Sequence, residues 1–124
     1  MAGNDNNING LIGAGVDIAG KLSFDGVLRV DGRFKGEIEA TGTLVVGEDG
    51  VLESRIKVDT AIISGEVRGV VEALRKVELH TRARMFGDII TPVIIVYPGA
   101  QFVGQCMMAS LRDNDVRQLI ENKS

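Results

Sequence analysis

The sequence predicts an all-β protein, built as a single parallel β-helix (solenoid) of about six coils. The first observation is a period: short apolar alternations recur about every 17 residues between Leu22 and Met108. The second is that three such alternations recur in step within each period. The third is composition, because glycine makes up 16 of 124 residues while aromatic residues make up only 4%. A core without large rings suits a narrow interior of Val, Ile and Leu with glycine at the corners.

The repeat is clearest in five segments that align beneath one another. They read GEIEA, SRIKV, GVVEA, GDIIT and GQCMM, and their starts are separated by 18, 15, 18 and 17 residues. The residue two before each start is apolar: Phe34, Leu52, Val67, Met85 and Phe102. The third residue of each is apolar or small: Ile38, Ile56, Val71, Ile89 and Cys106. A third set of recurring apolar positions lies upstream of these. It consists of the pairs Leu28/Val30, Leu44/Val46, Ala61/Ile63, Val77/Leu79 and Ile94/Val96.

Three short strands per unit, repeated at this spacing, are expected to stack like strand on like strand. Inward positions then form apolar ladders along the axis, and outward positions carry the charges. Six coils at ~4.8 Å each give a rod on the order of 25–30 Å long. A β-sandwich is the alternative, because short strands separated by turns also suggest that class. The stretch VRGVVEALRKVEL has helical spacing of apolar residues, but its alignment with its neighbours favours strands.

The chain divides into three parts. Residues 1–15 are rich in Asn and Gly and are expected to form a flexible N-terminal tail. Residues 16–108 form the β-helix domain, and an incomplete first copy of the repeat begins at Val16 and Ile18. Residues 109–124 form a flexible C-terminal tail, in which Val116, Leu119 and Ile120 would share one face of a short helix. That helix would cover the last coil, and a loose tail is the alternative.

Bulk properties exclude several classes of function. A net charge of −3 argues against nucleic acid as a partner. One cysteine, Cys106, and one histidine, His80, leave neither a disulfide framework nor a cysteine–histidine metal site. The start MAGNDNNING has no basic and apolar regions of a secretory signal, and no run reaches the ~18 apolar residues of a membrane-spanning helix. We expect a cytoplasmic protein without cofactor or metal.

No arrangement of residues indicates catalysis, so we expect no enzyme. A left-handed hexapeptide-repeat acyltransferase is the enzyme alternative, but spacings of 15 to 18 residues do not match strict six-residue steps. His80 and the RARM segment at 82–85 are interpreted as solvated surface. Cys106 falls on an inward position and is interpreted as a small buried apolar residue.

The ends of the rod are the predicted interaction sites, because an open β-helix leaves unpaired strand edges and core ladders there. At the C-terminal coil the candidates are Ile94, Val96, Phe102, Cys106 and Met108. At the N-terminal coil they are Val16, Ile18, Leu22 and Phe24. A candidate lateral apolar surface consists of Val93, Ile95, Val103 and Met107. Coils of separate molecules would stack end to end, or a monomeric adaptor would dock one partner through its C-terminal coil.

Two segments carry a resemblance to a known family. GKLSFDGVLRVDGRFKGEIEATGTLVVGEDGVLES (20–54) and VRGVVEALRKVELHTRARMFGDIITPVIIVYPGAQFVG (67–104) resemble the bactofilins, which are bacterial cytoskeletal polymer proteins. The resemblance implies a right-handed, three-sided β-helix that assembles without nucleotide into non-polar filaments and bundles. It also implies a scaffold for cell shape or for the localisation of cell-wall or polar proteins. The implied partners are the chain itself, other bactofilins, cell-wall enzymes and polar proteins.

The resemblance implies a cytoskeletal location, often along the inner face of the cytoplasmic membrane. Many members carry a short N-terminal membrane-targeting segment. Here that region offers only Ile8, Leu11 and Ile12, without Lys, Arg or aromatic residues. These three residues are candidates for a weak membrane contact, which usually needs a second signal. We therefore expect no strong direct binding to membrane.

Overall fold

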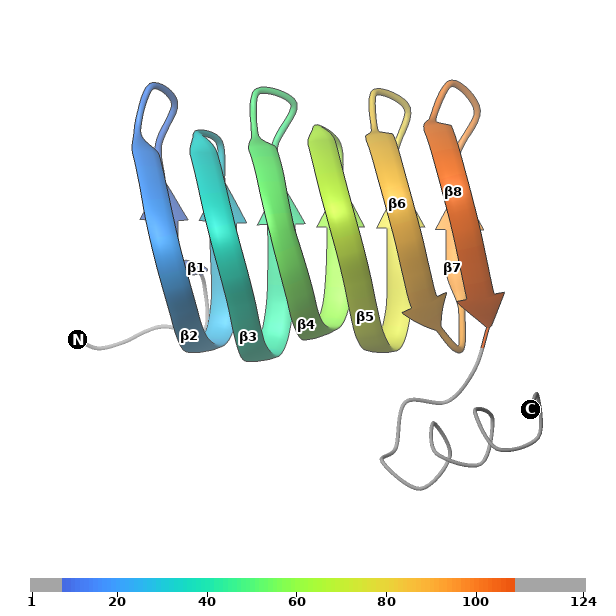
Figure 1. Ribbon diagram of the computed structural model, residues 1–124, viewed down its shortest axis with the longest axis horizontal. Coiled ribbons are helices and arrows are strands. Elements are labelled where there is room, and N and C mark those ends of the chain that lie inside the picture. Colours follow the sequence, from blue (N-terminus) through green and yellow to red (C-terminus); the bar gives the residue numbers. More distant parts are fainter. Residues whose placement is uncertain (1–7, 109–124) are drawn as a thin grey trace.

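A computed structural model describes residues 8–108 of the chain, which form one parallel sheet wound into a rod (Figure 1). The sheet order is β1-β2-β3-β4-β5-β6-β8, and β7 pairs with β5. The predicted β-helix is confirmed, and the stretch with helical spacing is part of strand β5. The strands are β1 (Ile8–Ile12), β2 (Asp17–Val30), β3 (Arg33–Val46), β4 (Val51–Ile63), β5 (Glu66–Leu79), β6 (Arg84–Thr91), β7 (Ile94–Val96) and β8 (Gln101–Met108).

Each coil has three sides, and in β2 to β5 two of the corners lie inside a strand, whereas β6 and β7 are separated at the second corner. On β3 these corners are Gly36 and Gly42, with φ of 134° and 153°. The strand bends there without losing its neighbours, so one long strand replaces the separate short strands that the repeat predicts. We call the stretch before Gly36 the first side, the stretch between the glycines the second side, and the stretch after Gly42 the third side.

The third corner is a loop, and its length varies along the rod. Four-residue loops occupy 13–16, 47–50, 80–83 and 97–100, whereas only two residues connect β2 to β3 and β4 to β5. A backbone hydrogen bond closes each four-residue loop, for example from the Gly50 N–H to the Gly47 carbonyl at 2.9 Å. The unequal loops explain part of the uneven spacing of the repeats.

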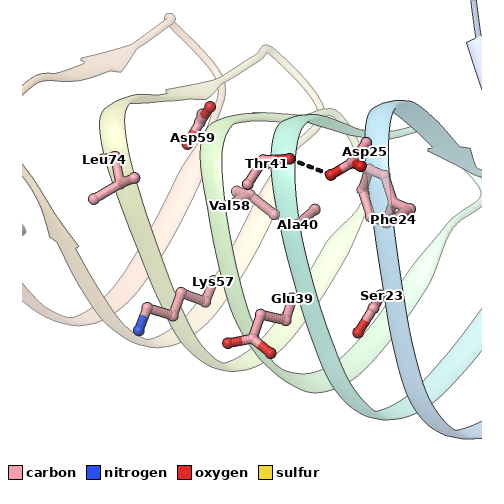
Figure 2. A pocket seen from close by; sticks show the side chains of 10 residues that line it. All are labelled: Ser23, Phe24, Asp25, Glu39, Ala40, Thr41, Lys57, Val58, Asp59 and Leu74. Atoms are coloured by element: carbon pink, nitrogen blue, oxygen red, sulfur yellow. Dashed lines mark hydrogen bonds between the residues drawn. The ribbon is translucent and has the colours of Figure 1, made fainter.

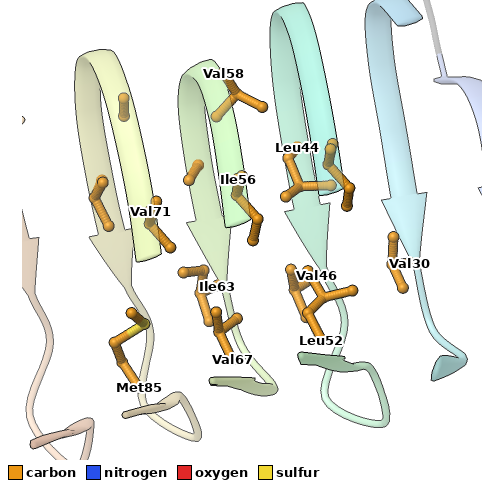
Figure 3. Packing of buried hydrophobic residues seen from close by; sticks show 14 of the residues in the cluster. Val30, Leu44, Val46, Leu52, Ile56, Val58, Ile63, Val67, Val71 and Met85 are labelled. Atoms are coloured by element: carbon orange, nitrogen blue, oxygen red, sulfur yellow. The ribbon is translucent and has the colours of Figure 1, made fainter. Parts of the chain in front are cut away.

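The core consists of apolar ladders that run along the axis (Figure 3). On the first side, Phe34 stacks on Leu52, Leu52 on Val67, and Val67 on Met85. Parallel ladders follow the second side through Ile38 and the third side through Leu44 and Val46, and all of these side chains are buried. Because every inward position is covered by the coils above and below it, the ladder is exposed only at the two ends.

The sheet begins earlier than residue 16, the predicted start of the β-helix. Strand β1 pairs in parallel with β2, with Leu11 beside Arg29 and Ile12 beside Val30. Residues 8–12 are therefore the third side of the first coil and not part of a tail. The short helix predicted within residues 109–124 lies outside the described residues.

The corner glycines allow a direct test of close coil stacking. A Cβ atom on Gly36 would lie 1.8 Å from the carbonyl oxygen of Gly20, whereas a Cβ on Gly20, which has the same φ of 134°, would meet nothing within 4 Å. Gly36→Ala is expected to cost at least about 3 kcal/mol, and Gly20→Ala about 1–2 kcal/mol for the positive φ alone. Thermal unfolding followed by circular dichroism measures both. Equal losses would contradict the contact between coils.

Candidate assembly interfaces

The C-terminal end of the rod is an open apolar face, formed by the free edges of β7 and β8. Within residues 8–108, each of these strands pairs on one side only, β7 with β5 and β8 with β6. Their inward residues are the last members of the core ladders. Phe102 lies on Met85, Cys106 on Ile89, Met108 on Thr91, Ile94 on Val77 and Val96 on Leu79. The structure thus brings all five predicted C-terminal residues to one end of the rod.

The inward residues of this face are more exposed than their ladder partners one coil below. The ladder partners one coil below are buried, whereas Val96 is 51% and Met108 60% exposed. Phe102 and Ile94 are half-buried against the core. Cys106 is exposed, which corrects the interpretation of a buried residue. It does occupy the inward position, but no further coil among the described residues covers it.

The N-terminal end has a similar arrangement on two of its sides. Ile18 lies beneath Phe34, Leu22 beneath Ile38, and Phe24 beneath Ala40. Ile18 is exposed, and Leu22 and Phe24 are half-buried against the core. Val16 differs from the prediction, because it lies in the loop between β1 and β2 and not on a ladder. Its carbonyl accepts a hydrogen bond from the Arg33 N–H at 2.8 Å.

The predicted lateral surface is not a single surface. Val93 and Ile95 lie at the third side, Val103 on the first side and Met107 on the second side of the last coil. All four are exposed, but they face three directions. The reason is that the last coil, like every other, carries its outward residues around a triangle.

The residues predicted for a weak membrane contact are also separated. Ile12 is 6% exposed and belongs to the core, whereas Leu11 points outward and is 62% exposed. Adjacent residues of a strand face opposite sides, so Leu11 and Ile12 cannot contact one surface together. Ile8 lies in the same strand. Among residues 8–108, no helix has the length and apolar character needed to cross a membrane.

A groove lies on the corner between the second and third sides (Figure 2). It arises because Asp59 alone spans this corner in β4, where Leu74 and Arg75 span it in β5. Leu74 therefore projects beside the groove and is 44% exposed. The Thr41 hydroxyl donates a hydrogen bond to the Asp25 carboxylate at the rim. The lining residues are Ser23, Phe24, Asp25, Glu39, Ala40, Thr41, Lys57, Val58, Asp59 and Leu74.

The polar groups of the rod form surface pairs rather than a catalytic centre. Within the described part of the chain, no three His, Cys, Asp or Glu side chains come together as ligands for a metal ion. His80 is half-buried, with its ring stacked on Tyr97 at 4.5 Å between centroids and its Nε2 3.0 Å from a Glu78 oxygen. The hydrogen bonds from Lys76 and then His80 lower the pKa of Glu78, so that this carboxylate is ionised at neutral pH.

Large apolar side chains that are strongly exposed gather at the two ends of the described rod. All of them except Leu74 lie in residues 11–18 or 93–108. The sequence pattern did not reveal the third side of the first coil, because INGLI carries Gly10 at the position of Leu28 and its register shifts between Ile8 and Gly10. It also did not reveal the groove, although the spacing of only 15 residues between SRIKV and GVVEA was a signal of a shortened coil.

Cys106 provides a chemical probe of the C-terminal face. Partial burial raises the pKa of its thiol, so alkylation at neutral pH is slow but measurable in the exposed state. If this face is covered in an assembly, we expect the alkylation rate to fall by about tenfold or more above the assembly concentration. Mass spectrometry after timed iodoacetamide treatment measures the rate. A rate that does not change with protein concentration would place the contact elsewhere.

Comparisons with known proteins agree with this architecture. The family described as "Bactofilin: Polymer-forming cytoskeletal" matches residues 10–107. Bactofilin BacP of Myxococcus xanthus is 37% identical over 111 residues, which cover 90% of this chain but only 46% of BacP. Bactofilin BacO of the same organism is 39% identical over 100 residues, 81% of this chain and 79% of BacO.

A solved structure shares the fold as well. The Thermus thermophilus bactofilin, determined by cryo-electron microscopy as double helical filaments, matches with a TM-score of 0.67 and 31% identity. The match covers 77% of this chain and 95% of that one. The family is one of structural proteins and not of enzymes. With its six-level β-helix and its match over residues 10–107, the chain belongs to the bactofilins, the family of polymer-forming cytoskeletal proteins.

Proposed function

We propose that this chain assembles end to end, without nucleotide, into non-polar filaments that act as a cytoskeletal scaffold. The observation that carries the proposal is the pair of open ends, each with free strand edges and apolar ladder residues. Stacking a second rod on an end pairs those edges and covers those side chains at once. The filaments of the Thermus thermophilus relative support the same use of the fold.

Two features support assembly without nucleotide. The groove of Figure 2 is lined by Asp25, Glu39 and Asp59 with Lys57 as its one cation, which opposes the binding of a polyphosphate. Contacts between apolar ladders and strand edges need no bound ligand to form. The non-polar arrangement, in which like ends meet, is the one that family membership favours, and two-fold contacts of this kind are self-complementary.

We further propose that the filament positions other bacterial proteins, such as cell-wall enzymes or polar proteins, or further bactofilins. Charges alternate along the first side through Lys35, Glu53 and Arg68 and along the second side through Glu39, Lys57 and Glu72, so both sides offer polar docking surfaces. Direct insertion into membrane is not proposed, because Leu11 and Ile12 face opposite sides of their strand.

Sedimentation in nucleotide-free buffer tests the proposal. The pelleted fraction is expected to rise steeply above a threshold concentration of the chain and to stay unchanged on addition of ATP or GTP. Dependence on nucleotide would overturn the nucleotide-free mechanism. A monodisperse chain at all concentrations would favour the adaptor alternative, for which the exposed C-terminal coil with Val96 and Met108 is the specific support.

A further inference from the structure

The outward face of the third side carries a row of six residues, one from each stacked coil of the rod. We call it the third-side row, and we number the stacked positions on each side as levels one to six from the N-terminal end. Parallel pairing fixes its order as Leu11, Arg29, Val45, Ile62, Glu78 and Ile95. This face lies at the back in Figure 1. Val45 and Ile62 are half-buried at its centre, and Leu11 and Ile95 are exposed at its ends.

The third-side row reads the same from both ends except for the sign of its charges. Levels one, three, four and six are apolar, level two is Arg29, and level five is Glu78. In the neighbouring row the symmetry holds at the centre, where Thr43 and Thr60 occupy levels three and four, but not at levels two and five, which are Val27 and Lys76. At the loop corner, Asp31 follows the third side at level two and His80 follows it at level five.

From this order we propose that a second copy of the chain packs face to face on the third side with its axis reversed. A two-fold axis parallel to the strands, between levels three and four, places Val45 against the partner's Ile62. The same axis places Arg29 against the partner's Glu78 and Leu11 against the partner's Ile95. The inference rests on the proposed function, because it describes how two filaments pair along their length.

The other two sides lack an apolar centre in this arrangement, although Glu53 would meet Arg68 on the first side and Lys57 would meet Glu72 on the second. Both of these sides also bring like charges together at levels two and five. On the first side, the same operation places Arg33 at level two against Arg84 at level five. On the second side it places Glu37 against Asp88. Like charges that meet across an interface are unfavourable and suppress wrong pairings. The third-side row is therefore the one whose central contact is apolar and whose flanking charges, Arg29 and Glu78, are opposite.

The two charged residues of the third-side row are held in place within the chain. Arg29 Nε donates to an Asp31 oxygen at 2.9 Å, and this ion pair raises the pKa of the guanidinium. Lys76 Nζ lies 2.7 Å from the Glu78 carboxylate. These contacts orient both side chains before association, which lowers the entropy lost on pairing. In a filament the third-side row repeats with every subunit, so weak contacts add along the length.

The test compares two valine-to-lysine variants at central levels on different sides of the rod. Val45→Lys sets a charge against the partner's Ile62 at the centre of the contact, and an unpaired charge there is strongly unfavourable. Val70→Lys alters a half-buried outward valine at level four of the second side. Neither residue lies at an end face, so both variants are expected to form filaments. Electron microscopy should show paired filaments for the unmodified chain and Val70→Lys, and single filaments for Val45→Lys, with pairing affinity reduced about tenfold or more.

Mixing variants tests the reversed orientation. Val45→Lys mixed with Ile62→Glu is expected to restore pairs, because the lysine of one copy then faces the glutamate of the other, whereas neither variant pairs alone. Pairs that persist in Val45→Lys would overturn the proposal. The proposal would also be overturned if unmodified filaments stayed single and floated with phosphatidylglycerol vesicles, and if Val45→Lys abolished that flotation. This result would show that the third side binds lipid.

Absence of filaments from the unmodified chain would contradict the proposed function separately. In that case analytical ultracentrifugation decides the inference. Dimers that Val45→Lys dissociates and Val70→Lys preserves would still support it, and monomers of the unmodified chain would overturn it.

Discussion

Replacing Phe102 by arginine is expected to abolish filaments while leaving the β-helix folded. Phe102 ends the ladder that runs through Phe34, Leu52, Val67 and Met85, and it is half-buried at the C-terminal face. In the isolated rod an arginine there can extend into water. In a stacked pair it would be enclosed as an unpaired charge, at a cost of about 3–5 kcal/mol. Association through this face should weaken by at least about 100-fold.

Val103→Arg is the matched control for this prediction. Val103 is the next residue on the same strand, but it points outward from the first side and is exposed. Filaments are expected from Val103→Arg and not from Phe102→Arg, by sedimentation and negative-stain electron microscopy. Circular dichroism should show the same β-sheet content in both. Filaments from Phe102→Arg would move the essential contact away from the C-terminal face.

Replacing Ile18 by arginine is expected to have an equally large effect at the opposite end. Ile18 lies beneath Phe34 on the first coil and is exposed at the N-terminal face. If like ends meet, this variant keeps its C-terminal contact and should stop at dimers. Phe102→Arg should then stop at dimers joined through their N-terminal faces. Ala19→Arg, which alters the adjacent outward residue, is the control and should still polymerise.

The mass of the particles that remain decides the polarity of the filament. Analytical ultracentrifugation of Ile18→Arg and Phe102→Arg should give dimers for each variant. Monomers from each variant, together with dimers when the two are mixed, would show that unlike ends meet. That result would keep the filament but reject its non-polar form.

Much of the fold could be predicted because the repeat itself encodes the register. The alignment of Phe34, Leu52, Val67, Met85 and Phe102 in sequence is the ladder observed in the structure. Period-two alternation also separates inward from outward residues, so it places the five C-terminal candidates correctly at one end. Because equivalent residues of successive coils stack on one another, each coil repeats the apolar pattern of its neighbours. The strand assignment of one coil is therefore supported by the coils beside it.

The sequence misleads where the repeat is weak or where direction around the rod matters. Strand β1 pairs by its backbone although its sequence INGLI lacks the apolar alternation, so the pattern predicts a tail for residues 8–12. Val93, Val103 and Met107 share an apolar, outward character in the sequence. Alternation shows whether a residue points toward the core or toward solvent, but it does not show on which of the three sides the residue lies. Exposure of Cys106 depends on whether another coil covers the last one, which the ladder position alone does not determine.

The most direct test of end-to-end stacking is the direction of the coil spacing within a filament. Cryo-electron microscopy of the polymer in nucleotide-free buffer gives an averaged diffraction pattern along the filament axis. Rods that stack on their end faces place the ~4.8 Å spacing of successive coils along that axis, as a meridional reflection. We predict this reflection at ~4.8 Å. The same spacing found perpendicular to the axis would show that the rods associate side by side, and would contradict assembly through the open ends.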